Sequence, residues 1–237
     1  MRRETQNVLL ILLGGALLKI SFTGTFLRYV KPSHKWLLIA AGGIMVGLAL
    51  VSILRDLVGA RVASSEGHHH SSRSAWLLLL PVLAVFLVAP PALGADSVAG
   101  TSAAPRSSSA QEDGSALFPP LPAGDVVEVP LSDFASRAAW DRGNSLDGRA
   151  VRLTGFVVHD GSATYVARLV IACCAADAFP VKVKLDNPQV TGLRNDTWVD
   201  ITATVVPGSA TRANDFVPSA TVVDVREIAA PEDPYEH

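Results

Sequence analysis

The sequence contains few of the residues on which protein chemistry most often depends. Of its 237 residues, two are cysteine, two are methionine and 6% are aromatic. Lysine and arginine together number 20, aspartate and glutamate 22, and the formal net charge is −2 at pH 7. A surface that binds nucleic-acid phosphates needs an excess of basic residues. This balance argues against nucleic acid as a partner.

Motifs typical of common enzymes are also missing. The sequence has no nucleophile elbow of a hydrolase, no glycine-rich phosphate loop and no metalloprotease helix motif. The nearest approach to an acid/base set consists of His159, Asp160 and Asp177. Scattered groups of this kind are usually solvated loop residues. We therefore predict that the protein is not an enzyme.

Long apolar runs are present, and all of them precede Gly94. They cover residues 8–30, 36–54 and 75–94, and the second has nineteen residues without a charge. A helix of about 20 apolar residues can cross the hydrocarbon core of a bilayer. Lys19 in the first run must then face a partner or reach the membrane interface. We predict a transmembrane region over residues 1–94, with three helices in contact with membrane lipid.

Charges between the runs indicate the orientation of this region. Cytoplasmic loops carry an excess of lysine and arginine. An N-terminus inside the cell leaves three basic residues outside and places five arginines in the cytoplasm, namely Arg2, Arg3, Arg55, Arg61 and Arg73. The third run ends in Ala-Leu-Gly-Ala at residues 92–95, which resembles a signal cleavage site. Both features predict a multi-pass protein of the cell membrane with an extracytoplasmic C-terminal domain.

Two smaller features lie within the same region. Gly43 and Gly47 are four residues apart, a spacing that lets membrane helices approach closely. We expect the second span to pack on the first span or on another subunit. His68–His70 form a triple histidine between the second and third spans. Such a tract can bind a transition metal loosely, but it is more often a solvated loop.

The remainder of the chain reads as a linker followed by a globular domain. Residues 95–123 are rich in alanine, serine, glycine and proline and contain few large apolar residues. A segment of this composition cannot bury enough surface to offset the entropy lost on ordering. We therefore predict a disordered linker at 95–123 and a folded domain over residues 124–237.

The pattern of the C-terminal domain is that of a small all-β fold. A brief helix capped by Ser132 or Asp133 runs to Trp140, and a bend or bulge is expected at Gly155. The alternating segments are separated by turn dipeptides and cover residues 125–129, 150–158, 164–172, 179–185, 197–206 and 219–228. Short strands with few helices suit a closed barrel, because closure removes sheet edges. We expect an OB-like barrel.

The two cysteines are adjacent, where a strand gives way to a loop. Neighbouring Cα atoms lie about 3.8 Å apart, whereas a relaxed disulfide needs roughly 4.4 to 6.8 Å. If the chain turns here, the spacing of Cys174 and Asp177 brings them to one side of the turn. With Cys173, they offer two thiolates and a carboxylate, which zinc accepts. His159 is the candidate fourth ligand if the two strand ends converge.

Three interpretations of the cysteine pair stay open at this point. Free cysteine is often buried and packs as a small hydrophobic residue. The pair could instead bind a metal, or it could undergo redox or disulfide chemistry, since thiols outside the cytoplasm tend to oxidise. Against the redox interpretation, the Cys-x-x-Cys spacing of many catalytic thiol pairs is absent.

Several short stretches carry a family resemblance. After the N-terminal spans they are Thr-Gly-Phe-Val at 154–157, Cys-Cys-Ala-Ala-Asp-Ala-x-Pro at 173–180, Asp-Thr-Trp-Val at 196–199 and Pro-x-x-Pro-Tyr-Glu at 231–236. Together they resemble the YcgQ-like family of bacterial permease subunits, over nearly the whole chain apart from the linker. The resemblance implies a multi-span permease of the YcgR-like type as partner and a role in metal handling. The family has two spans where three are expected here.

Two functions from different classes follow from these features. The first is an accessory membrane subunit of a permease, whose extracytoplasmic β domain binds a divalent metal or small solute through Cys173, Cys174 and Asp177. Zinc is the expected metal. The alternative is a thiol redox or sensor protein of the cell surface that uses the adjacent cysteines.

Overall fold

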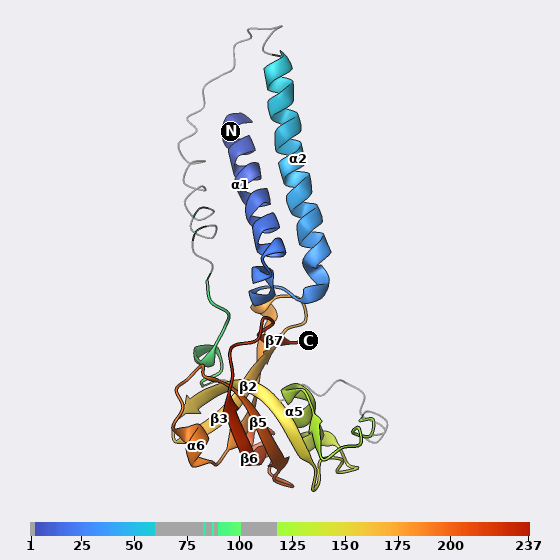
Figure 1. Ribbon diagram of the computed structural model, residues 1–237, viewed down its shortest axis with the longest axis vertical. Coiled ribbons are helices and arrows are strands. Elements are labelled where there is room, and N and C mark those ends of the chain that lie inside the picture. The colour runs from blue at the N-terminus through green and yellow to red at the C-terminus, as the bar shows by residue number, and fades with distance from the viewer. Residues whose placement is uncertain (1–2, 60–82, 84–86, 88–89, 101–117) are drawn as a thin grey trace. The chain divides into compact units, whose positions relative to one another are not determined.

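The computed structural model describes residues 3–59, 83, 87, 90–100 and 118–237 (Figure 1). The chain divides into two compact units, Met1–Pro91 and Ala92–His237, which we call the helical unit and the β unit. Most of the expected third span at 75–94 lies outside the described residues, as do His68–His70.

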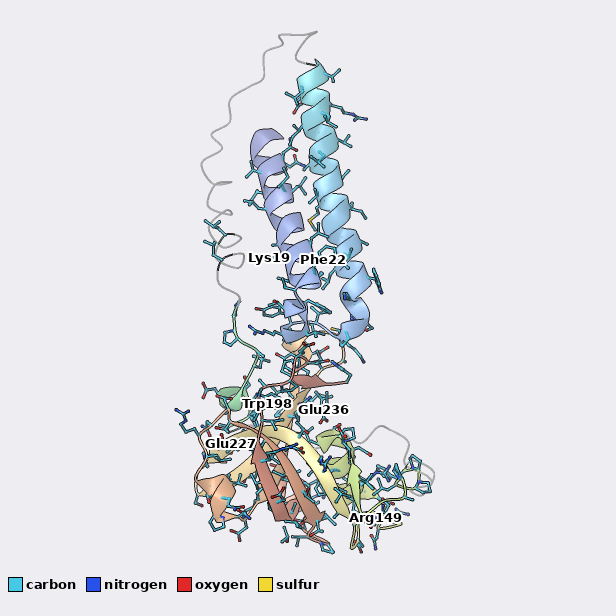
Figure 2. All side chains as sticks on the ribbon, viewed as in Figure 1. Lys19, Phe22, Arg149, Trp198, Glu227 and Glu236 are labelled. Atoms are coloured by element: carbon cyan, nitrogen blue, oxygen red, sulfur yellow. The ribbon has the colours of Figure 1, made fainter. Side chains whose placement is uncertain are left out.

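Two α-helices form most of the described part of the helical unit, α1 (Arg3–Phe22) and α2 (Lys35–Gly59). Gly24 takes a φ of +77° after α1, and a 3₁₀ turn follows, so the helix expected over 8–30 ends early, at Phe22 (labelled in Figure 2). Among the described residues, Pro32–Val58 alone is long and apolar enough to cross a membrane, whereas the apolar Gln6–Phe22 is shorter. One candidate span therefore remains of the first two.

Glycine residues bring α1 and α2 together, side by side (Figure 1). A Cβ atom added at Gly14 would lie 2.8 Å from the carbonyl oxygen of Gly42, and one added at Gly42 would lie 2.9 Å from that of Gly14. Small residues permit this close approach of two backbones. Cβ atoms added at Gly43 and Gly47 would meet no described atom within 4 Å. Helix α2 therefore packs on α1 through Gly42 rather than through the predicted pair.

The β unit contains a strand within or overlapping each predicted segment. The elements are β1 (Val126–Glu128), α5 (Leu131–Trp140), β2 (Ala150–Asp160), β3 (Ala163–Val170), β4 (Phe179–Leu185), α6 (Pro188–Thr191), β5 (Trp198–Val205), β6 (Ser219–Glu227) and β7 (Tyr235–Glu236). The short β7 and α6 were not expected. The sequence therefore predicts the main strands of this unit well.

Five of these strands pair in a ring. Strand β2 is antiparallel to β3 and to β5, β3 is antiparallel to β4, and β5 is antiparallel to β6. A parallel pairing of β4 with β6 completes the ring. The remaining two strands are parallel additions, β1 on β2 and β7 on β3. At Gly155 an added Cβ would lie 2.6 Å from the carbonyl oxygen of Ala167, so this glycine permits the close approach of β2 to β3.

Two apolar clusters hold the β unit together. The larger contains Leu153, Ile201 and Phe134 of α5, and the smaller contains Phe156 and Leu169. Because strand side chains alternate between two faces, β2 contributes Leu153 to one cluster and Phe156 to the other. Both faces of this strand are therefore covered.

The segment expected to be a disordered linker is packed at both of its described ends. Ala95 and Val98 are 1% and 0% exposed and belong to the smaller cluster. The Ala95 amide donates to Asp196 at 2.6 Å. At the other end, Leu121 packs against the larger cluster. The described ends of the range 95–123 therefore belong to the β unit, and residues 101–117 lie outside the described part.

Candidate metal centre

The loop with the two cysteines begins where β3 ends. Ile171, one residue beyond the strand, is buried, and its amide donates to the carbonyl oxygen of Glu236 at 3.0 Å. Cys174 has an extended backbone, with φ −156° and ψ 168°, and directly precedes a 3₁₀ turn over Ala175–Asp177. The chain therefore turns at the pair, which is the condition under which Cys174 and Asp177 come to one side of the turn.

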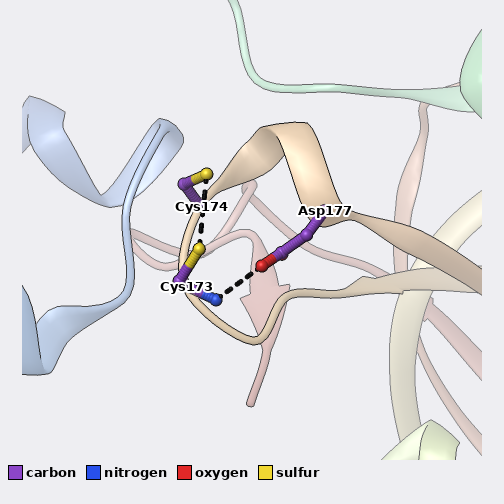
Figure 3. Close-up of side chains that lie close together, drawn as sticks. All are labelled: Cys173, Cys174 and Asp177. Carbon is purple, nitrogen blue, oxygen red and sulfur yellow. Dashed lines mark hydrogen bonds between the residues drawn. The ribbon is translucent and has the colours of Figure 1, made fainter.

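Asp177 closes this loop on itself. One oxygen of its carboxylate accepts the amide of Ala172 at 3.0 Å. The other accepts the amide of Cys173 at 2.9 Å, as Figure 3 shows. A carboxylate oxygen has two lone pairs, so each oxygen can accept an amide and still bind a cation. The carboxylate is therefore held in place beside the thiols before any ligand arrives.

The donor atoms of Cys173, Cys174 and Asp177 all lie within 4.8 Å of one another. The two sulfur atoms are 3.6 Å apart, and both cysteines are free (Figure 3). A tetrahedral zinc ion with Zn–S bonds of about 2.3 Å places its sulfur ligands about 3.8 Å apart. The sulfur separation therefore fits zinc with almost no movement. Cys173 is exposed and Cys174 is half-buried, which argues against the packing interpretation.

The electrostatics of the loop keep the thiol of Cys173 protonated. Its hydrogen bond with the Asp177 carboxylate, and secondly its contact with Cys174, raise the pKa of Cys173 from 9.0 to about 12. The hydrogen bond with the Cys173 thiol lowers the pKa of Asp177, and the bonds from the backbone amides of Cys173 and Ala172 lower it further. Thiolate is the nucleophilic form of cysteine, so this arrangement makes a poor nucleophile. A bound cation has the opposite effect, because it replaces the proton.

His159 does not join this group. Strands β2 and β3 form a tight hairpin, in which His159 pairs with Thr164 at the start of β3. Cys173 lies beyond the other end of β3, a strand of eight residues. At about 3.3 Å per residue, the strand separates the two positions by roughly 25 Å. The end of β2 therefore meets the beginning of β3, and the expected fourth ligand is wrong.

Both ring nitrogens of His159 already have partners. Nε2 lies 2.7 Å from the carbonyl oxygen of Leu193, and Nδ1 lies 3.2 Å from the hydroxyl of Thr164. Because a carbonyl oxygen can only accept, Nε2 must carry the hydrogen. We therefore assign His159 a structural role.

Sequence reasoning missed the groups that hold the loop in shape. The amides of Ala172 and Cys173, which bind Asp177, leave no signal in a sequence because every non-proline residue has such an amide. Glu236, unlike these amides, does leave a signal, because it belongs to the motif Pro-Tyr-Glu that carries part of the family resemblance. The sequence assigned this motif no structural role. The structure places its backbone against the start of the loop.

Comparison with known families also divides the chain into an N-terminal and a C-terminal part. The model of the DUF1980 N-terminal domain matches residues 5–103, and that of the DUF1980 C-terminal domain matches residues 141–237. No curated protein and no solved structure matches the chain. The first match extends through Ala95 and Val98, and the second covers strands β2 to β7 with the cysteine loop. The chain therefore contains both the N-terminal and the C-terminal domain of the DUF1980 family.

Proposed function

We propose that the protein is an accessory membrane subunit whose β unit binds a divalent metal ion, with zinc as the best fit. The observation that carries this proposal is the cluster of Cys173, Cys174 and Asp177, whose donor atoms lie within 4.8 Å of one another. Two sulfurs and one carboxylate oxygen form a ligand set that suits zinc. The ions that prefer oxygen ligands, magnesium and calcium, suit it poorly.

The number of ligands indicates how the metal is used. Structural zinc sites are usually closed by four protein ligands, whereas three protein ligands leave a position open. With Cys173 exposed, that open position is accessible from outside the β unit. An exposed three-ligand site suits an ion that is taken up and passed on as cargo.

The helical unit supports the membrane part of the proposal through one candidate span, Pro32–Val58. We infer a multi-pass arrangement with the β unit outside the cytoplasm, in agreement with the positive-inside distribution of arginines. The five-strand ring supports an OB-like barrel, a fold that presents ligand sites on its loops. On the resemblance to the YcgQ-like family, we infer that the partner is a multi-span permease of the YcgR-like type.

Zinc titration of the full-length protein tests the metal site. The protein is purified in detergent under reducing conditions and titrated by calorimetry, beside the double variant Cys173→Ser/Cys174→Ser. We expect one zinc ion per chain for the wild type and no binding for the variant. Binding no tighter than about 1 mM, or equal binding by both proteins, would remove the metal from the function.

Topology and partner need separate experiments. A membrane-impermeant maleimide applied to intact cells should label the cysteine pair if the β unit is outside, and labelling only after lysis would place it in the cytoplasm. Affinity purification of the full-length protein from membranes should recover a multi-span permease. Recovery of the chain alone, under conditions that preserve known membrane complexes, would argue against an accessory subunit.

A redox function is the second candidate, favoured by the 3.6 Å separation of the two sulfurs. A small disulfide would oxidise the pair, so that one Cys173–Cys174 bond forms, the reagent's own bond breaks and two reagent thiols carry away the hydrogens. The raised pKa of Cys173 makes this slow, since thiolate is the attacking form. Intact-mass spectrometry decides, because oxidation removes two hydrogens. A pair that stays reduced at extracellular redox poise rejects this candidate.

A further inference from the structure

We propose that Glu236 is a positioning residue for the cysteine loop, because it ties the end of β3 to the first turn of helix α5. The inference rests on the metal site proposed above and adds a residue that contributes no ligand atom. It gives the site a second anchor, separate from Asp177.

The first contact is made by the backbone of Glu236. Strand β7 is parallel to the end of β3, with Tyr235 paired to Leu169 and Glu236 paired to Val170. One residue further, the amide of Ile171 donates to the carbonyl oxygen of Glu236 at 3.0 Å. Cys173 follows two residues later. The backbone of Glu236 therefore pairs with the end of β3 and also binds the residue that follows the strand.

The second contact is made by the side chain of Glu236, labelled in Figure 2. Its two carboxylate oxygens accept the amides of Leu131 and Ser132 at 2.8 and 2.9 Å. These amides belong to the first turn of α5, where helical amides have no partner within the helix. Pro130 at the N-cap supplies no side-chain hydrogen bond. Glu236 therefore caps α5 from the far end of the sequence.

The side chain of Arg168, in β3, makes a third set of contacts with strand β7. Its Nη2 donates to the carbonyl oxygen of Tyr235 at 3.0 Å, and its Nε lies 3.8 Å from the Glu236 carboxylate. The guanidinium also lies over the ring of Trp198, 5.0 Å from its centroid. Burial lowers the pKa of Arg168, and the negative charge of Glu236 opposes this shift. The charge of Glu236 is therefore matched on two sides, by the helix terminus and by Arg168.

These contacts give the cysteine loop two anchors with different tasks. Asp177 binds amides within the loop and so determines its shape. Glu236 binds α5 and the end of β3, and so determines where the loop starts. If the second anchor is lost, the three ligand atoms keep their chemistry but lose their common position. Residues that orient metal ligands in this way typically change metal affinity about 10- to 100-fold when mutated.

The test compares Glu236→Gln with Glu232→Gln in the full-length protein in detergent. An amide has one acceptor oxygen, so after the first substitution the NH₂ group of the new side chain would face an amide donor of α5. Glu232 is an exposed glutamate of the same segment and serves as the matched control. We expect Glu236→Gln to weaken zinc binding about tenfold and to speed amide hydrogen exchange at Ala172 and Cys173. The Glu232→Gln variant should resemble the wild type in both.

A second control separates positioning from a general loss of stability. Ile201→Val removes one methylene group from the fully buried core, so it should lower the unfolding temperature without changing zinc affinity or the exchange of the loop amides. The absorption spectrum of the cobalt-substituted protein gives a further readout, because a distorted site loses the bands that are typical of tetrahedral cobalt. If Glu236→Gln does not fold, Glu236→Asp replaces it, because this side chain keeps the charge but is too short to reach both amides. Zinc binding and amide exchange are then measured on Glu236→Asp.

The exchange data keep this inference distinct from the metal proposal. If the wild type binds no zinc, the proposed function fails, but faster exchange at Ala172 and Cys173 in Glu236→Gln alone still supports positioning. Loop exchange that is the same in Glu236→Gln and Glu232→Gln overturns the inference. It is also overturned if Ile201→Val, at equal loss of stability, weakens zinc binding as much as Glu236→Gln does.

Discussion

Residues that commonly bind metals lie near both ends of strand β3, and the two groups differ in whether their donor atoms are engaged by other segments of the chain. At the start of β3, the imidazole of His159 has both nitrogens engaged, by Leu193 and by Thr164. At the other end, the polar contacts of the Cys173 and Cys174 sulfurs are with each other and with the Asp177 carboxylate. Residue type is therefore a poor guide to a metal site unless the ligand atoms are also available.

The difference arises from the chain segments that lie against each group. His159 lies against the segment before β5, where the carbonyl oxygen of Leu193 accepts a hydrogen bond from its Nε2. The cysteine loop instead uses a side chain, Asp177, to satisfy its own amides. The contacts of the thiols are then with each other and with Asp177, inside the same loop. The comparison predicts large effects of substitution at the cysteine end and small ones at the histidine end.

The largest effect is expected from loss of a single sulfur. Cys173→Ser and Cys174→Ser, made separately, should each weaken zinc binding more than about hundredfold, beyond the range of outer-shell changes. A hydroxyl is a far weaker zinc ligand than a thiolate at neutral pH. Calorimetric titration of each variant measures the loss. If one of the two variants binds as tightly as the wild type, that cysteine is not a ligand.

Asp177→Asn should have the next largest effect. The amide keeps one acceptor oxygen but turns a donor toward either Ala172 or Cys173, and the site loses its negative charge. We expect zinc affinity to fall about 10- to 100-fold, with faster amide exchange at both positions. The matched control is Asp186→Asn, at an exposed position outside the loop. Equal affinities of the two variants would show that Asp177 is not part of the site.

The affinity for zinc should rise steeply with pH. Because the pKa of Cys173 is raised to about 12, zinc must displace a proton from this thiol at every pH near neutrality. With the Cys173 thiol protonated, affinity should rise by at least about tenfold per pH unit between about pH 6 and pH 8, and protons should be released, at least one of them from Cys173. Calorimetry in buffers of different ionisation enthalpy counts these protons. A pH-independent affinity would mean that the thiols do not bind the ion.

The smallest effect is expected at the other end of the hairpin. His159→Ala should leave zinc affinity unchanged, because its imidazole lies far from the thiols. It should lower the free energy of unfolding by about 1 kcal/mol, since the carbonyl of Leu193 and the hydroxyl of Thr164 lose a partner. Denaturant unfolding and zinc titration of the same sample measure both. A large loss of zinc affinity would restore His159 as a ligand.

Much of the β unit can be predicted from the sequence. Alternating apolar residues and turn dipeptides locate β2 to β6 to within a few residues, because one face of each strand must be buried. The spacing of Cys174 and Asp177 likewise shows that a turn after β3 would bring their side chains to one side, although it does not predict the turn itself. These features depend on neighbours in the sequence, and a local pattern is sufficient to reveal them.

Features that depend on distant contacts could not be predicted in this way. Val98 lies in a stretch of small and polar residues, yet it is fully buried because it packs against β2 and β3. The pairing of β7 with β3 joins residues 66 positions apart in sequence. The choice of His159 as a ligand failed for a related reason. It required the ends of β2 and β3 to converge, which a tight hairpin forbids.

The most direct test of the account is X-ray absorption at the zinc edge of the full-length protein loaded with one equivalent of zinc. We predict two sulfur scatterers at about 2.3 Å and oxygen scatterers at about 2.0 to 2.2 Å, without the outer-shell pattern of imidazole. The sulfur signal should halve in either single cysteine variant that still retains zinc. A wild-type spectrum with nitrogen and oxygen ligands alone would contradict the assignment of Cys173 and Cys174 as the metal site.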